Sequence, residues 1–161
     1  MAEQLTNATM DVMDTISGKL GSCFTTINGR RYNFMQARKI TATVEKLKTA
    51  VPILGKTGQS NKSTGWKGSG SAEFYFNTSI FAEMMETFKD SGKDIYFTMQ
   101  LINDDPNSKS YGQQVTLIDC NLDKVILAAL DITSDDPLTS STDFTFDDYH
   151  IDKPFNDLDG M

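Results

Sequence analysis

The sequence predicts a mainly β protein with one flanking helix, and three observations support this fold class. Apolar and polar residues alternate with period two over most of the chain, which is typical of strands with one buried face. Residues 79–91 depart from that period and carry apolar side chains at helical spacing. The chain has 161 residues, of which 39% are hydrophobic, so it is long enough for one domain with a buried core.

The first expected element is a hairpin near the start of the chain. Residues 22–27 and 31–36 flank the dipeptide Asn28-Gly29, which tolerates the positive φ angles of a type I′ turn. The same alternation then predicts a series of further strands. These lie at residues 39–45, 71–76, 95–101, 115–122, 125–132 and 143–149.

Two of the expected strands have special features. Between Leu117 and Ile118 the apolar positions change parity, which predicts a bulge or a strong bend. Residues 125–132 are apolar on both faces, so we expect this stretch to be the most buried strand.

The helix expected at 79–91 is amphipathic. Thr78 or Ser79 can cap its start, and Gly92 can close its end. We expect its apolar side chains, two methionines among them, to fill the core rather than to form a groove for a partner. The apolar face consists of Ile80, Phe81, Met84, Met85 and Phe88.

Two regions differ from the rest of the chain in composition. Residues 50–70 are rich in Gly, Lys, Ser, Thr and Asn and contain no acid, so we predict a long functional loop at 50–66. Residues 134–161 are strongly acidic. A basic loop and an acidic tail on one domain favour contact between copies of the same chain. The expected organisation is an N-terminal extended arm at 1–20, a β domain at 21–150 and an acidic C-terminal tail at 151–161.

The overall charge excludes one broad class of function. Asp and Glu number 22 against 15 Lys and Arg, for a formal net charge of −7. Such a chain is a poor candidate for gripping nucleic acid, because that affinity comes mainly from Lys and Arg. The charge still allows the protein to work beside DNA without adhering to it.

The sequence predicts neither a targeting signal nor a membrane span. Residues 1–13 have no basic start and no apolar run, so we expect no secretory signal. The longest apolar run, at 125–130, is far shorter than the ~20 residues that cross a bilayer. Cys23 and Cys120 are too few and too far apart for a disulfide scaffold or a metal knuckle, and we expect both to be buried.

Three motifs suggest chemistry, and each has a simpler interpretation. Residues 50–57 resemble a phosphate-binding loop with Ala50 in place of its first Gly, but no helical pattern follows to supply the phosphate-binding amides. The adjacent Asp pairs do not match the spacing of a calcium loop. His150, the only histidine, has no nucleophile motif nearby. We therefore expect no enzyme activity, no metal site and no cofactor.

Six stretches, in order along the chain, resemble the PBSX-type tail tube proteins. Those proteins build the inner tube of contractile phage tails, of defective prophages and of phage-tail-like bacteriocins. The resemblance runs from about Asp14 to Tyr149, which is nearly the whole domain. The stretches are DTISGK at 14–19, NGRR at 28–31, ATVEK at 42–46, TGWKGSG at 64–70, GKDIYF at 92–97 and DFTFDD at 143–148.

The resemblance implies a fold, an assembly and a set of partners. The fold would be a β-sandwich or barrel of two packed antiparallel sheets with one flanking helix. The chain would form hexameric rings whose sheets join edge to edge around a lumen, and the rings would stack into a tube in the bacterial cytoplasm. Partners would be further copies of the chain, a tail sheath protein outside, a tape measure protein and DNA in the lumen, and baseplate and tail terminator proteins at the ends.

The resemblance also implies roles for particular residues. In that family the long loop reaches the adjacent ring, so we expect Lys56, Lys62 and Trp66 in a ring-stacking interface. The strands that flank this loop are expected to line the lumen with their polar faces. We expect Glu45 and Glu73 to make the lumen negative. The lumen-facing residues would be Thr41, Thr43, Glu45, Ser71 and Glu73.

Two other interpretations of the sequence stay open. Trp66 can stack on a sugar, so one alternative is a monomeric carbohydrate-binding β-sandwich module. The other is a nucleotide-dependent enzyme, which would require residues 50–57 to bind phosphate. Rings or tubes of the purified protein would distinguish a structural subunit from both.

Overall fold

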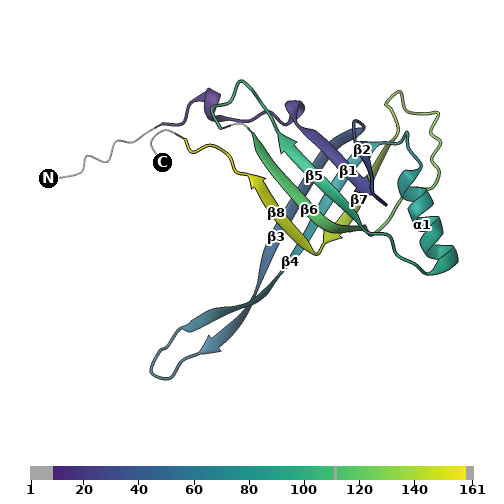
Figure 1. Cartoon of the computed structure of the whole chain (residues 1–161). Helices are drawn as coiled ribbons and strands as arrows, with labels where there is room; N and C mark the ends of the chain where they lie inside the picture. Colours follow the sequence, from purple (N-terminus) through teal and green to yellow (C-terminus); the bar gives the residue numbers. More distant parts are fainter. Residues whose placement is uncertain (1–8, 111, 159–161) are drawn as a thin grey trace. The chain divides into compact units, whose positions relative to one another are not determined.

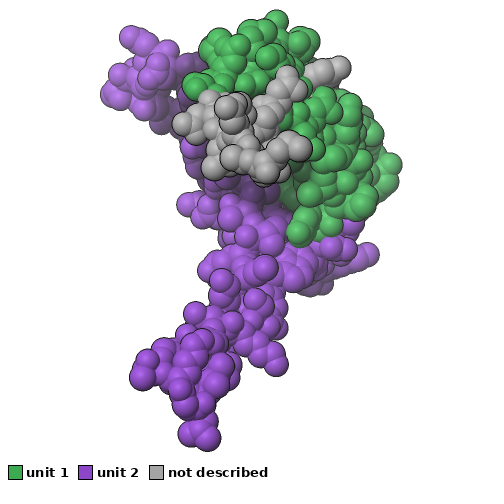
Figure 2. Space-filling view, turned by 90° about the vertical axis from the view of Figure 1, so that its left-hand side faces the viewer, with its two compact units in different colours: residues 1–35, 98–117, 149–161 green, residues 36–97, 118–148 purple. Residues whose placement is uncertain are grey.

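The computed structural model describes residues 9–110 and 112–158, and the chain divides into two compact units. Unit 1 comprises residues 1–35, 98–117 and 149–161, and unit 2 comprises residues 36–97 and 118–148 (Figure 2). Within the described residues the chain is mainly β with one α-helix, which confirms the predicted fold class. The packing of two sheets into a sandwich or barrel stays a prediction.

Unit 1 holds the strand order β2-β1-β5-β6, with β8 beside β6. The expected hairpin of β1 and β2 is confirmed, because Asn28 and Gly29 have φ angles of 50° and 80°, as a type I′ turn requires. Strand β6 continues from unit 1 into unit 2. The bounds are β1 Ser22–Ile27, β2 Arg30–Asn33, β5 Phe97–Asn103, β6 Gln113–Leu122 and β8 Asp148–Lys153.

Residues 9–20 are more structured than the extended arm predicted for 1–20. They contain two short 3-10 helices, η1 (Val12–Asp14) and η2 (Gly18–Leu20). The buried carboxylate of Asp105 accepts a hydrogen bond from the backbone N–H of Ser17 at 2.9 Å. This bond fastens the segment to the loop that follows β5; residues 1–8 of the predicted arm lie outside the described residues.

Unit 2 holds the antiparallel order β6-β7-β4-β3 and the helix (Figure 1). Its core is aromatic: the Phe81 ring lies 5.5 Å from that of Phe74 and 5.8 Å from that of Phe97, between ring centroids. The left-handed Gly92, with a φ of 68°, ends the helix as predicted. The bounds are β3 Ala37–Pro52, β4 Gln59–Tyr75, α1 Ile80–Ser91 and β7 Thr139–Phe146.

The predicted irregularity of the 115–122 strand is confirmed. Asp119 in β6 has a φ of 56°, which lies in the left-handed region that non-glycine residues rarely adopt. The parity of the buried positions changes here because the backbone itself departs from extended geometry.

The loop predicted at 50–66 is wrong. Residues 50–52 end β3, residues 59–66 begin β4, and only 53–58 form the connection. Both strands are exposed to solvent on both faces there, so their residues do not need the apolar alternation that marks a half-buried strand.

The strand predicted at 125–132 is also wrong. No strand includes these residues, and the side chains of Leu127, Leu130 and Ile132 are 75%, 97% and 97% exposed. An apolar run shows that a stretch can be buried, but not that a neighbouring strand is there to bury it. The last predicted strand, 143–149, instead falls across β7 and β8.

Among the described residues, no helix has the length and apolar character that a membrane crossing requires.

Candidate functional site

One face of the ladder formed by β3, β4 and β7 is polar and exposed. In the register, Thr41 lies opposite Ser71 and Ser71 opposite Asp143, so their side chains share one face. Short hydroxyl side chains predominate on it. The polar face consists of Lys39, Thr41, Thr43, Glu45, Lys67, Ser69, Ser71, Glu73, Ser141, Asp143 and Thr145.

On β4 and β7 the opposite face of the ladder is buried, and two glycines of β4 are required on it. Gly68 pairs with Phe146 and Gly70 with Phe144, and both rings lie over the glycine backbone. A Cβ atom at Gly68 would lie 2.3 Å from the Phe146 ring, and one at Gly70 would lie 2.4 Å from the Phe144 ring. This packing fixes which side chains of β4 point toward the core, and therefore which ones form the polar face.

The charges on the polar face are largely paired. Arg38 Nη1 lies 2.9 Å from Glu73 Oε1, and Lys67 Nζ lies 3.5 Å from Glu45 Oε2. In the described part of the chain, Lys39 and Asp143 have no ion pair within 4 Å. The two acids predicted to make this surface negative are thus each neutralised by a neighbouring cation.

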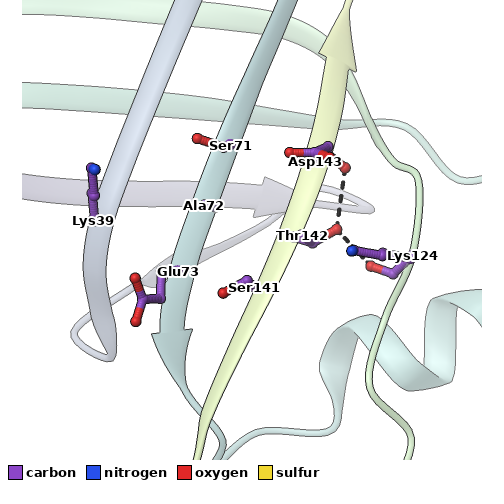
Figure 3. Close-up of a pocket in the computed structure, with 8 residues that line it drawn as sticks. All are labelled: Lys39, Ser71, Ala72, Glu73, Lys124, Ser141, Thr142 and Asp143. Atoms are coloured by element: carbon purple, nitrogen blue, oxygen red, sulfur yellow. Dashed lines mark hydrogen bonds between the residues drawn. The ribbon is translucent and has the colours of Figure 1, made fainter.

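Two shallow hollows lie on the polar face. The first, of about 170 Å³, is shown in Figure 3, where the Thr142 hydroxyl donates to the carbonyl oxygen of Lys124 at 2.6 Å. The second, of about 290 Å³, lies beside Thr41, Thr43 and Thr145. Over residues 9–110 and 112–158, no cluster of three His, Cys, Asp or Glu side chains could hold a metal ion. The surface is a hydroxyl-rich wall rather than a ligand pocket.

Beyond the polar face, β3 and β4 continue as a projecting hairpin. Among the described residues, β7 pairs with β4 only over residues 68–75, so residues 46–52 and 59–67 are paired only across the hairpin of β3 and β4. Figure 1 shows this pair of strands leaving the sheet, and in Figure 2 unit 2 narrows into the same projection. We call residues 46–67 the arm.

The arm is basic and carries exposed apolar side chains. It has five lysines and no acid. Leu54 at its tip is 103% exposed, and Trp66 near its base is 42% exposed. Such apolar exposure on a narrow projection is typical of a surface that a partner covers. The other exposed apolar residues of the arm are Leu47, Val51 and Ile53.

The arm contains all three residues predicted for ring stacking, at separate places along it. Lys56 lies in the turn, and its ammonium donates to Ser60 Oγ at 3.0 Å. Lys62 lies opposite Thr49, and Trp66 lies opposite Lys46. Their role in a contact between rings stays a prediction.

Sequence reasoning missed the apolar side chains of the arm. Leu47 and Val51 lie at odd-numbered positions of β3, and Ile53 continues this spacing just beyond its end, which was the available signal. The many glycines and lysines that surround them favoured a loop instead.

The geometry does not support the catalytic motifs. Residues 50–57 cover the end of β3 and the turn, and the next element is β4 rather than the helix of a phosphate-binding loop. His150 Nε2 lies 3.8 Å from Asp152 Oδ1 on an exposed strand. Burial raises the pKa of Cys23 to about 12, so this free cysteine is a protonated thiol rather than a nucleophilic thiolate.

Sequence comparison identifies relatives over almost the whole chain. The profile of a family described as "Phage tail tube protein" matches residues 8–152. "Phage-like element PBSX protein XkdM" of Bacillus subtilis (strain 168) is 36% identical over 148 residues, which cover 92% of this chain and 97% of the relative. "Uncharacterized protein YqbM" of the same organism is 37% identical over 142 residues, which cover 88% and 93%.

Solved structures share the fold at low sequence identity. A chain of the anti-feeding prophage baseplate has a TM-score of 0.62 at 12% identity, with 89% of this chain and 96% of that chain covered. A chain of an extracellular contractile injection system, the PVC sheath–tube complex in its extended state, has a TM-score of 0.61 at 5% identity, with 91% and 93% covered. A chain of the SPP1 tail tube has a TM-score of 0.58 at 11% identity, with 91% and 82% covered. The family profile over residues 8–152 and the relative at 36% identity show that the chain belongs to the phage tail tube protein family.

Proposed function

We propose that this tail tube subunit forms hexameric rings that stack into the inner tube of a contractile tail, with the polar face lining the lumen. The observation that carries the proposal is the exposed polar face on a ladder whose edge strand is open. In the described residues, β4 is the only strand that pairs with β3, although β3 is 16 residues long. An open edge of this length favours pairing with another chain, and closure into a ring removes the edge.

Similar structures support a ring of six. The anti-feeding prophage chain belongs to a baseplate that is described as 6-fold symmetrised. If the β3 edge joins the next copy around such an axis, six polar faces form one continuous inner wall. On β4 and β7 the opposite face is committed to the aromatic core of the same copy.

The polar face has the properties expected of a channel wall that does not bind what passes it. Its short hydroxyl side chains offer no deep pocket, and its ion pairs leave few charges free to hold a passing polymer. We therefore propose a polar lumen whose negative charge comes less from Glu45 and Glu73 than the sequence predicted. DNA and a tape measure protein would pass such a wall without adhering.

The same proposal extends to stacking and to partners. The basic arm, with Lys56, Lys62 and Trp66, would contact the adjoining ring. A sheath protein would surround the tube, and baseplate and terminator proteins would cap its ends in a tail assembled in the bacterial cytoplasm. We propose no catalytic activity, since the residues that suggested it do not come together.

Size-exclusion chromatography and negative-stain electron microscopy of the purified protein test this function. We expect hexamer-sized species, and rings or tubes with a central channel at high protein concentration. A protein that stays monomeric at every concentration, and that binds glycans through Trp66, would contradict the proposal in favour of a carbohydrate-binding module.

A further inference from the structure

A second exposed segment of unit 2 has properties opposite to those of the arm. Residues 125–136 follow β6 and carry the exposed side chains of Leu127, Leu130 and Ile132. They include three aspartates and no lysine or arginine. We call these residues the acidic segment; its aspartates are Asp131, Asp135 and Asp136.

The acidic segment is fastened at both ends and leaves three large apolar side chains, those of Leu127, Leu130 and Ile132, in solvent. At its start, the Thr142 hydroxyl donates to the carbonyl oxygen of Lys124 at 2.6 Å. Just beyond its end, the N–H of Phe76 donates to the carbonyl oxygen of Leu138 at 2.9 Å. Leucine and isoleucine side chains at 97% exposure forgo the stabilisation that burial gives, which favours a partner that covers them.

The arm is complementary to the acidic segment in both charge and polarity. The arm has five lysines and no acid, and apart from Lys67, which pairs with Glu45, its lysines have no ion pair within the described residues. Its apolar residues Ile53 and Leu54 are exposed at the tip. Hydrogen bonds from the hydroxyl and the backbone N–H of Thr133 lower the pKa of Asp131, which favours its charged form. Opposite charges around apolar contacts give a protein interface its specificity and its orientation.

The two surfaces lie at opposite ends of the β4–β7 ladder. Gly68, beside the arm, pairs with Phe146, whereas Tyr75 at the other end pairs with Thr139, where the acidic segment returns to the sheet. Figure 1 shows the arm and this connection pointing away from the sheet in different directions. The arm of one copy therefore cannot cover the acidic segment of the same copy. A second copy, placed head to tail, brings them together, and repetition of such a contact builds an open stack.

We propose that the acidic segment, residues 125–136, is the seat in which the arm of a copy in the adjoining ring docks. The proposal rests on the proposed function, because it assumes that rings stack through the arm. The apolar tip of the arm packs on Leu127, Leu130 and Ile132, and the lysines of the arm pair with the three aspartates. Each copy then contributes one arm and one seat.

Charge exchange tests the seat. Asp135→Lys with Asp136→Lys is expected to raise the protein concentration needed for tube growth about tenfold, since two favourable pairs become repulsive. Combining it with Lys56→Glu and Lys62→Glu should restore growth to within about threefold of the unmodified chain. Glu83→Lys with Glu86→Lys, two exposed acids on α1, is the matched control and should leave growth unchanged. Normal tubes from the Asp135 and Asp136 variant, or no restoration in the combined variant, would overturn the seat.

Crosslinking gives an independent readout. Cys23 and Cys120 are buried, so engineered cysteines can be addressed separately. Leu54→Cys combined with Leu130→Cys, treated with a short bis-maleimide, should give covalent ladders in assembled tubes. Leu54→Cys with Glu86→Cys should not. If tubes form without crosslinked ladders, or if both variants give equal ladders, the arm does not dock on the acidic segment. The proposal that rings stack would still hold. Failure of the unmodified chain to form tubes would instead contradict the proposed function.

Labelling with a maleimide distinguishes a second copy from another partner. In the Leu130→Cys variant, the new thiol should react with maleimide at least about tenfold more slowly in tubes than in the monomer if the arm covers it. Equal rates would show that tubes leave the acidic segment open to a different protein, and would overturn the proposal.

Discussion

Single residues decide which face of the central ladder becomes the polar face. Gly68 and Gly70 leave room for Phe146 and Phe144, and this packing commits one side of β4 to the core. The alternation of Thr41, Thr43 and Glu45 with apolar neighbours was visible in the sequence, so the polar face could be predicted. The pairing of Glu45 with Lys67 could not, because it joins residues whose cross-strand register the sequence leaves open.

The first prediction concerns Gly70. A Cβ atom there would lie 2.4 Å from the Phe144 ring and 2.5 Å from the carbonyl oxygen of Thr41, and a backbone atom cannot move aside without disturbing the sheet. Gly70→Ala should lower the free energy of unfolding by at least about 2 kcal/mol in denaturant titrations.

Gly65→Ala is the matched control for this prediction. Gly65 has no atom within 4 Å of its Cβ position, so its replacement should change the free energy of unfolding by less than about 0.5 kcal/mol. Equal stabilities of the two variants would show that the ring of Phe144 does not require a glycine.

The second prediction concerns the pH dependence of stability. Desolvation raises the pKa of Cys23 from 9.0 to about 12, so the thiol stays protonated in the folded state while it ionises in the unfolded state. Its contribution to stability is complete below pH 9 and is lost as the pH rises toward 12. Between pH 8 and pH 10 the free energy of unfolding should fall by about 1.4 kcal/mol through this group.

Cys23→Val isolates that contribution. The variant lacks the thiol, so its free energy of unfolding should fall by about 1.4 kcal/mol less over the same pH interval. Identical pH profiles of the two proteins in urea titrations would contradict a buried thiol at this position.

At the scale of elements, the sequence predicted correctly those turns and helix ends whose backbone conformation depends on one or two residues. The hairpin at Asn28-Gly29 and the helix ending at Gly92 depend on backbone conformations that particular residues favour. The arm escaped prediction because its strands meet solvent on both faces. Residues 125–132 were misassigned because an apolar run does not reveal whether another strand lies beside it.

The third prediction concerns the arm as an element. Lys56→Glu with Lys62→Glu should suppress tube growth, because two exposed cations in the proposed ring contact become acids on an already acidic protein. The monomer should keep its circular dichroism spectrum and its unfolding midpoint, since both lysines are exposed and neither is in an ion pair within the described residues.

Lys19→Glu with Lys93→Glu makes the same change of charge at exposed positions outside the arm. In sedimentation assays, this control variant should form tubes at the same protein concentration as the unmodified chain. If both double variants grow equally well, the arm does not make the contact between rings.

At the scale of the whole molecule, the family assignment and the proposed assembly have different supports. Membership of the phage tail tube family follows from the profile over residues 8–152 and from a relative at 36% identity. The ring, the lumen and the stacking contact are inferred from the open edge of β3, the polar face and the arm. In the proposed assembly, the open edge of β3 pairs with another copy, the polar face lines a channel, and the arm contacts the next ring.

The measurement that tests the central proposal most directly is a helical cryo-electron microscopy reconstruction of tubes grown from the purified chain. We predict six copies per ring, with the side chains of Thr41, Thr43 and Ser71 on the inner wall and the arm reaching the adjoining ring. A reconstruction that places Glu45 and Glu73 on the outer wall, toward the sheath, would contradict the assignment of the polar face to the lumen.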